Sequence, residues 1–167
     1  MGTVKGLNHV GLSVSDLDVA VGFFRDVMGL ELMGSGEVTY PHLDEIIGIG
    51  PTRLRWAELT TPGEELLELF QYMEPEGKAH SDQRTCDPGT VHVCFECDDV
   101  AAVLTRATDA GYLARTASAV RIPFGDWEGW LCVYVVGPDS ITIELVQRPE
   151  GASPGVPGAA ARRRDAR

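Results

Sequence analysis

The stretch LNHVGLSVSDLDVAVGFFRDVMGL, residues 7–30, decides the fold because the chain contains a second version of it. Residues 90–113 read TVHVCFECDDVAAVLTRATDAGYL, and His9 aligns with His92 in the two copies. Each copy begins with alternating residues, as in a half-buried strand, and continues with apolar residues at helical spacing. We interpret the chain as a tandem duplication of modules of about 75–80 residues, too few copies for a solenoid.

Each module is predicted to fold as β-α-β-β-β, which places the protein in the α+β class. Ser15 and Asp98 are the expected N-caps of the two helices. Gly29 and Gly111 are expected to end them. The first helix has an apolar face at helical spacing, formed by Leu17, Val21, Phe24 and Met28. Strands are expected at residues 7–14, 30–36, 53–60 and 65–72, and at 90–97, 112–117, 130–136 and 141–148.

Two connections are long enough to act as binding loops. Residues 34–52 are expected to contain a short helix near Leu43–Ile47, and residues 117–130 are rich in glycine and aromatic residues. The modules are placed at residues 6–75 and 89–148. The tail, residues 149–167, has no periodicity and is predicted to be disordered.

Each module also contains, near its end, the motif Glu-Leu-x-Gln, at Glu68–Gln71 and at Glu144–Gln147. Both glutamates lie in otherwise apolar strands, where an unpaired carboxylate is costly. His9 and His92 each lie on a strand face that alternates with a purely apolar face, which suits packing against the helix. We therefore expect the histidines and the glutamates to line a common concavity.

Two imidazoles and two carboxylates from matching strands form a metal-ligand set, namely His9, Glu68, His92 and Glu144. Nitrogen and oxygen donors suit one divalent ion of Ni, Co, Zn, Fe or Mn. Taken alone, a histidine on a strand is more often a core or surface residue than a ligand. The recurrence of both residue types at matching positions in both copies favours the metal site.

Composition excludes several classes of partner. The formal net charge is −11, and residues 1–148 carry −13 because the tail holds four arginines and two acidic residues. A nucleic-acid binder needs a basic face, so we expect no nucleic acid partner. No apolar run approaches the roughly 18 residues that span a bilayer, so no membrane partner is expected. The N-terminus lacks the apolar core of a secretory signal, and a cytoplasmic protein is expected.

The four cysteines are Cys86, Cys94, Cys97 and Cys132. Cys94 and Cys97 form a Cys-x-x-Cys, but residues three apart on a strand point to opposite faces. A redox pair normally opens a helix, and a zinc knuckle needs a second pair. The cysteines are therefore expected to be free thiols in the core.

Paired β-α-β-β-β modules with His, Glu, His and Glu at these points resemble the vicinal oxygen chelate superfamily, which includes glyoxalase I, methylmalonyl-CoA epimerase, extradiol dioxygenases, and fosfomycin and bleomycin resistance proteins. The resemblance covers about residues 6–148 and is carried by NHVGLSVSDLDVAVGFF, LLELFQ, GTVHVCFECDDV and YVVGPDSITIELVQ. It implies two half-sheets that form a curved cup around the metal, with the helices outside and open metal positions for substrate oxygens.

The resemblance also implies a reaction, in which the metal acts as a Lewis acid and a proton next to a carbonyl is removed and returned. We expect a lyase or isomerase of the glyoxalase or epimerase type that acts on a small-molecule substrate. An Fe(II)-dependent dioxygenase is an alternative, since His9, His92 and Glu144 would supply its 2-His-1-carboxylate triad. A protein of the bleomycin-resistance type that sequesters an antibiotic or aromatic ligand is another. Glu68 as a fourth ligand favours the glyoxalase type.

Glu68 and Glu144 are the candidate catalytic bases. The resemblance implies that Glu144 anchors the metal, whereas Glu68 occupies a position that varies between Glu and an amide. Because half-cups expose apolar sheet edges, a symmetric homodimer is expected. Further candidates for substrate contacts are Arg53, Arg55, Arg115 and Arg121 for carboxylates, and Trp127 and Trp130 for a flat ring, although surface and structural roles are open for all six.

Overall fold

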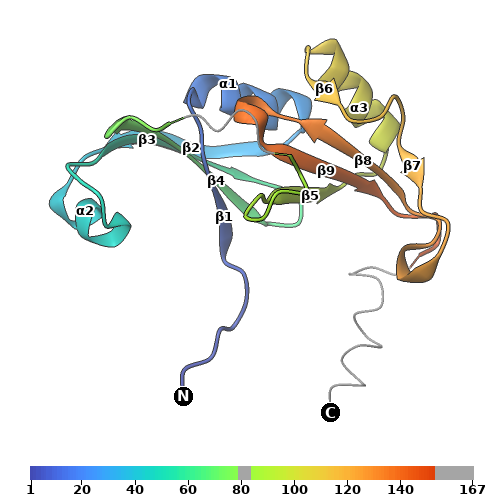
Figure 1. The fold of residues 1–167 in the computed structure, drawn as a ribbon, viewed down its shortest axis with the longest axis horizontal. Coiled ribbons are helices and arrows are strands. Elements are labelled where there is room, and N and C mark those ends of the chain that lie inside the picture. Colours follow the sequence, from blue (N-terminus) through green and yellow to red (C-terminus); the bar gives the residue numbers. More distant parts are fainter. Residues whose placement is uncertain (79–83, 153–167) are drawn as a thin grey trace. The chain divides into compact units, whose positions relative to one another are not determined.

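The structure is a computed structural model that describes residues 1–78 and 84–152. The chain divides into two compact units (Figure 1). Unit 1 comprises Met1–Gln83 with Pro138–Ser140, and unit 2 comprises Arg84–Gly137 with Ile141–Arg167. Each unit contains one mixed sheet, so the predicted α+β class is confirmed. The predicted disorder of the tail falls mostly on residues after Ala152, which lie outside the described part of the chain.

Unit 1 follows the predicted order of elements, and its sheet has the strand order β1-β4-β3-β2. β1 pairs with β4 in parallel, and the other neighbours are antiparallel. Helix α1 packs on β3 and β4. The elements are β1 (His9–Ser13), α1 (Leu17–Gly22), a π-helical turn (Phe23–Val27), β2 (Glu31–Val38), α2 (Pro41–Ile47), β3 (Arg53–Thr60) and β4 (Leu66–Glu74). β2 pairs with β3 as far as Val38, so the connection expected to begin at residue 34 is shorter than predicted.

Unit 2 repeats this plan with the strand order β5-β9-β8-β6, and β5 and β9 are again the parallel pair. Its elements are β5 (His92–Glu96), α3 (Val100–Asp109), β6 (Leu113–Ala114), β7 (Val120–Arg121), a 3-10 turn (Gly125–Trp127), β8 (Leu131–Val136), a second 3-10 turn (Pro138–Ser140, assigned to unit 1) and β9 (Thr142–Gln147). The strand predicted at 112–117 has only two residues. The expected loop 117–130 contains β7, because Val120 and Arg121 pair with the first residues of β8.

Within residues 1–78 and 84–152, no helix is long and apolar enough to cross a membrane.

The buried face of the first helix differs from the predicted face. Leu17 and Phe24 are buried as expected, but Val21 and Met28 are only half-buried. The spacing rule assumes 3.6 residues per turn, whereas the helix ends in a π-helical turn, which is wider and rotates the following side chains. The positions that join the core instead are Ala20, Phe23 and Val27.

Both helices begin after an aspartate one residue later than the predicted caps. Asp16 and Asp99 have extended backbones, and their carboxylates accept hydrogen bonds from backbone N–H groups of the first turn at 3.0–3.1 Å. Ser15 and Asp98 are therefore not the N-caps. Both helices end at glycines with positive φ, as predicted: Gly29 at 83° and Gly111 at 89°.

The glutamines of the two Glu-Leu-x-Gln motifs also accept hydrogen bonds from the first residues of the helices. Gln71 Oε1 accepts a hydrogen bond from Leu17 N at 3.3 Å, and Gln147 Oε1 accepts one from Val100 N at 3.0 Å. Leu17 and Val100 are the first residues of α1 and α3, whose N–H groups have no partner within the helix. Since residues three apart on a strand point to opposite faces, each glutamine contacts the helix and each glutamate lies on the other face.

All four cysteines are free thiols, as predicted. Their placement in the core was wrong, because Cys86 and Cys94 are exposed and Cys97 and Cys132 are half-buried. Cys94 and His92 lie on the same face of β5, since they are two residues apart on one strand.

Candidate metal centre and adjoining cavity

Unit 1 brings His9 and Glu68 together. They lie on the parallel strands β1 and β4, and the register places Gly11 directly opposite Glu68. His9 and Glu68 are therefore diagonal neighbours across the two strands, and His9 Nε2 lies 3.1 Å from Glu68 Oε2. The imidazole side chain is 42% exposed and the carboxylate side chain 19% exposed, so the carboxylate lies deeper than the imidazole.

The hydrogen bond of His9 to its neighbour leaves Nε2 facing the carboxylate. His9 Nδ1 lies 2.8 Å from Asn8 Oδ1, and the neutral tautomer with its proton on Nδ1 donates to this oxygen. In that tautomer Nε2 carries a lone pair directed at Glu68 Oε2. Two lone-pair atoms 3.1 Å apart need a proton or a cation between them. Holding the outer ring nitrogen in this way is typical of metal-binding histidines.

Unit 2 repeats the pair with His92 and Glu144. The strands are again parallel, with Cys94 opposite Glu144 in the register. His92 Nε2 lies 2.9 Å from Glu144 Oε2, and the side chains are 49% and 18% exposed. The distances and exposures of the two pairs therefore match closely, as the duplication predicts.

The second pair has additional contacts around its carboxylate. Cys132 Sγ donates to Glu144 Oε1 at 3.0 Å, which leaves Oε2 to face the imidazole. The His92 ring packs edge-on against Tyr134, with centroids 5.6 Å apart. Burial, followed by interactions with Glu144, raises the pKa of Cys94, Cys132 and Tyr134 to about 12. These groups therefore remain protonated at neutral pH.

The donor atoms of each pair fit a first-row divalent cation. Two ligand atoms bound at about 2.1 Å and at right angles around one ion lie about 3.0 Å apart. The observed separations are 3.1 Å in unit 1 and 2.9 Å in unit 2. Each pair therefore provides one nitrogen and one oxygen at the spacing of neighbouring ligands.

The convergence of all four ligands on one ion stays a prediction. In the described residues no group of three or more His, Cys, Asp and Glu side chains is gathered so that it could hold a metal. Each unit brings together two of the four predicted ligands. A complete set needs a pair from each unit, whether from one chain or from two.

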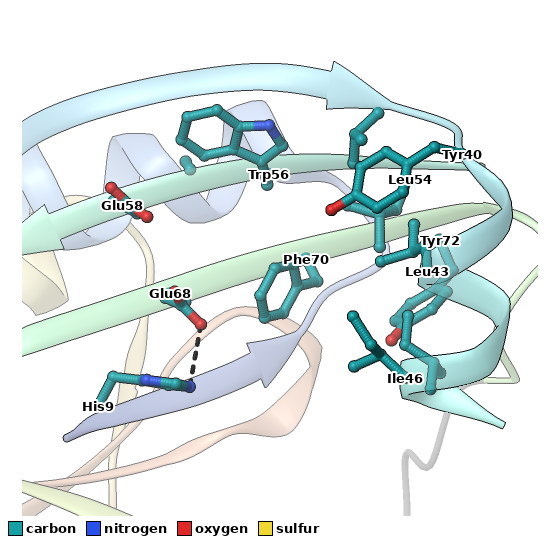
Figure 2. Close-up of a pocket in the computed structure, with 13 residues that line it drawn as sticks. His9, Tyr40, Leu43, Ile46, Leu54, Trp56, Glu58, Glu68, Phe70 and Tyr72 are labelled. Atoms are coloured by element: carbon teal, nitrogen blue, oxygen red, sulfur yellow. Dashed lines mark ion pairs between the residues drawn. The ribbon is translucent and has the colours of Figure 1, made fainter. Parts of the chain in front are cut away.

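Unit 1 contains a cavity of about 440 Å³ beside its pair. Figure 2 shows His9, Glu58 and Glu68 toward one end of the cavity and Tyr40, Leu43 and Tyr72 toward the other. Helix α2 supplies part of the wall, so the short helix predicted in this connection lines the cavity. The lining residues are His9, Val38, Tyr40, Leu43, Ile46, Ile47, Leu54, Trp56, Ala57, Glu58, Glu68, Phe70 and Tyr72.

Glycines on neighbouring strands allow two aromatic rings to lie flat along the cavity. A Cβ atom added at Gly36 would lie 3.1 Å from Trp56 Nε1, and one at Gly34 would lie 3.6 Å from the same indole. A Cβ atom at Gly11 would lie 3.3 Å from the Phe70 ring. The missing side chains therefore leave the space that the two rings occupy, which gives the cavity an aromatic surface.

Glu58 is an acidic cavity residue that was not predicted from the sequence. It lies directly opposite Glu68 in the antiparallel β3–β4 register, and both carboxylates line the cavity. The available signal was the alternation in β3, which places Leu54, Trp56 and Glu58 on one face. The repeat could not draw attention to Glu58, because the residue opposite Glu144 in the second module is Tyr134 and not a glutamate.

Three of the four arginine candidates have protein partners. Arg53 pairs with Glu37 and Arg55 with Asp18, both at 2.9 Å, and Arg121 donates to the Gly129 carbonyl at 2.8 Å. The hydrogen bond from Arg55 holds the pKa of the Asp18 carboxyl below its ordinary value.

Trp130 has a structural position in unit 2. It is 5% exposed, and the Arg148 guanidinium lies 5.2 Å from the centre of its ring. Trp127 packs edge-on against it, with ring centroids 4.8 Å apart. Burial leaves no open ring face on Trp130 for a substrate.

Known proteins are similar to this chain in sequence and in fold. The chain is 32% identical over 163 residues to a 2-epi-5-epi-valiolone epimerase of an Actinomyces species, covering 87% of this chain and 81% of that protein. It is 27% identical over 157 residues to a lactoylglutathione lyase of Schizosaccharomyces pombe, covering 90% of this chain and 49% of the lyase. The crystal structure of a glyoxalase family protein from Bacillus cereus matches the fold with a TM-score of 0.77 at 24% identity, covering 87% of this chain and 95% of that one.

The duplicated modules, their strand orders and the structural match agree on one fold. The family model of the Glyoxalase/Bleomycin resistance protein/Dioxygenase superfamily matches residues 6–145, which include both His–Glu pairs. The chain belongs to the Glyoxalase/Bleomycin resistance protein/Dioxygenase superfamily.

Proposed function

We propose that the protein is a divalent-metal-dependent enzyme that removes a proton from a carbon next to a carbonyl and returns it, as an isomerase or epimerase does. The observation that carries the proposal is the repeated His–Glu pair, with nitrogen–oxygen separations of 3.1 and 2.9 Å. Two relatives support it, since one is named an epimerase and the other a lactoylglutathione lyase.

The metal would be held by His9 and Glu68 from unit 1 and by His92 and Glu144 from unit 2. Their nitrogen and oxygen donors suit Ni, Co, Zn, Fe or Mn. When bound, such a cation withdraws electron density from a carbonyl oxygen, which makes the neighbouring C–H group more acidic.

In this proposal Glu58 moves the proton. A carboxylate that coordinates a cation loses basicity, so Glu68 in the ligand set is a weaker base than a carboxylate outside it. Glu58 is opposite Glu68, lies outside the ligand set and lines the same cavity. In our proposal its carboxylate accepts the proton from the substrate carbon, and the resulting carboxylic acid returns it.

The test combines metal analysis with proton exchange. Protein stripped of metal and reloaded with each of the five ions is incubated in D₂O with neutral α-hydroxy ketones, and deuterium incorporation next to the carbonyl is followed by NMR. We expect one metal ion bound per chain, and we expect deuterium incorporation only when the metal is bound. Oxygen consumption with Fe(II) and no exchange would identify a dioxygenase. Failure to bind any of the ions, with no exchange, would favour a binding protein.

A further inference from the structure

We infer that the cavity of unit 1 takes a compact molecule with an apolar ring and no negative charge, whose oxygen-bearing end lies toward His9 and Glu68. This inference rests on the proposed function for the direction of the ligand, but the size, shape and charge of the part that unit 1 holds follow from its cavity. A volume of about 440 Å³ is within the range of about 300–1,000 Å³ that small-molecule sites occupy.

The charge of the ligand follows from the residues that line the cavity. Among these described residues none is Arg or Lys, and two are the carboxylates Glu58 and Glu68. Arg53 and Arg55 lie on β3, the strand that carries Glu58, but neither lines the cavity, and both are paired with carboxylates. In the proposed ligand set two carboxylates neutralise the cation, so Glu58 still adds a negative charge. An anionic ligand would be repelled by it without a compensating cation.

The shape of the ligand follows from the aromatic surface. Trp56 lies against Gly34 and Gly36, and Phe70 lies against Gly11, so both rings are held by backbone rather than by mobile side chains. Aromatic rings positioned in this way stack on a flat or alicyclic ring with little loss of conformational entropy.

Helix α2 supplies apolar surface that a ligand would cover. Ile46 is 77% exposed and Tyr40 is 46% exposed, although both line the cavity. The loop that follows α2 is held by Asp44 Oδ1, which accepts from Thr52 N at 2.8 Å, and Gly48 ends the helix in the left-handed conformation. The apolar wall is thus anchored, and burial of its exposed residues favours an apolar ligand.

The experiment compares two probes of similar shape on metal-free protein. The neutral probe is 2-hydroxyacetophenone, and the anionic probe is phenylglyoxylate, which carries a carboxylate in place of the CH₂OH group at the oxygen-bearing end. Binding is followed by calorimetry and by quenching of tryptophan fluorescence in the parent, Trp56→Phe and Trp127→Phe proteins. We expect the neutral probe to bind about tenfold or more tightly than the anion, and the quenching to disappear in Trp56→Phe but not in Trp127→Phe.

A pair of glycine variants tests the aromatic surface. Gly36→Ala forces the Trp56 ring to shift, whereas a Cβ at Gly22 meets only Asp26 Oδ2 at 3.9 Å. We expect Gly36→Ala to weaken neutral binding about fivefold or more and Gly22→Ala to leave it unchanged. Glu58→Gln should reduce the preference for the neutral probe. Equal or tighter binding of the anion, no binding of the neutral probe at millimolar concentration, or equal effects of the two alanines would overturn the inference.

Because these measurements need no metal and no turnover, they separate the two proposals. Binding of the neutral probe without metal-dependent exchange would refute the proposed reaction and support the ligand class. Metal-dependent exchange with an anionic substrate that binds unit 1 would support the proposed reaction and refute the ligand class.

Discussion

Glu58 and Glu68 are direct cross-strand partners in the β3–β4 ladder, and both line the cavity of unit 1. One carboxylate is within 3.1 Å of an imidazole nitrogen, and the other is outside the predicted ligand set. In the proposed function Glu68 binds the cation and Glu58 moves the proton, because a cation that holds a carboxylate also lowers its basicity.

Glu58→Gln is expected to keep the metal and to lose proton exchange. Removal of a positioned base typically costs about 10²–10⁴-fold in rate. Glu68→Gln should instead weaken metal binding, and Glu144→Gln should weaken it more, because Cys132 also orients the Glu144 carboxylate. Metal content and deuterium incorporation are measured for each variant, with Glu45→Gln as an exposed control on α2. Full exchange in Glu58→Gln would place the base elsewhere.

His9→Ala and His92→Ala are expected to weaken metal binding to similar extents, because the two pairs have matching geometry. Loss of a direct ligand should exceed the roughly 10–100-fold cost of losing a residue that hydrogen-bonds to a ligand. Competition with a chromophoric chelator gives the affinities. His42→Ala is the control, since His42 is 81% exposed on α2. A loss in one variant only would show that the two units do not share one ion.

Cys132→Ala is expected to weaken metal binding about tenfold, because Glu144 would lose the hydrogen bond that orients its carboxylate. Cys132→Ser should restore most of the affinity, since a hydroxyl also donates. Cys86→Ala is the control, because Cys86 is exposed. Equal affinities for the alanine, serine and parent proteins would show that the thiol does not position Glu144.

Gln147→Ala is expected to lower the free energy of unfolding by about 1 kcal/mol, the usual cost of losing a hydrogen bond at a helix start. The N–H of Val100 would lose its acceptor at the beginning of α3. Urea denaturation measures the change. Metal affinity should stay unaltered, because Gln147 and Glu144 point to opposite faces of β9. A loss of affinity equal to that of Glu144→Gln would contradict this division.

Stability is expected to fall in alkali partly because of Cys97. Burial, with the nearby Asp98, raises the pKa of its thiol from 9.0 to about 11. Between these values the unfolded chain releases the proton and the folded chain keeps it, so the free energy of unfolding decreases as pH rises. Urea denaturation at several values from about pH 8 to pH 11 should show a smaller decrease for Cys97→Ala than for the parent. Parallel curves would mean that the thiol ionises equally in both states.

Much of the fold was accessible from sequence because the duplication repeats each signal. The alternation around His9 and His92 fixed two strands, and Gly29 and Gly111 ended the helices as predicted. The errors came from local geometry that spacing does not encode. A π-helical turn rotated the buried face of the first helix, and Asp16 and Asp99 took the capping positions because their carboxylates reach the first-turn N–H groups.

The candidate site divides in the same way. Alternation and repetition identify His9, Glu68, His92 and Glu144 as unusual polar residues on matching strands, because burying a carboxylate is costly unless it is paired. Pairing distances, the proximity of Glu58 to Glu68 and the hydrogen bond from Cys132 depend on strand register, which brings together residues from different parts of the chain. The sequence by itself therefore determined which side chains are chemically unusual. Tertiary structure alone decided which of them touch, because contacts across a ladder follow from the pairing of strands and not from spacing along one strand.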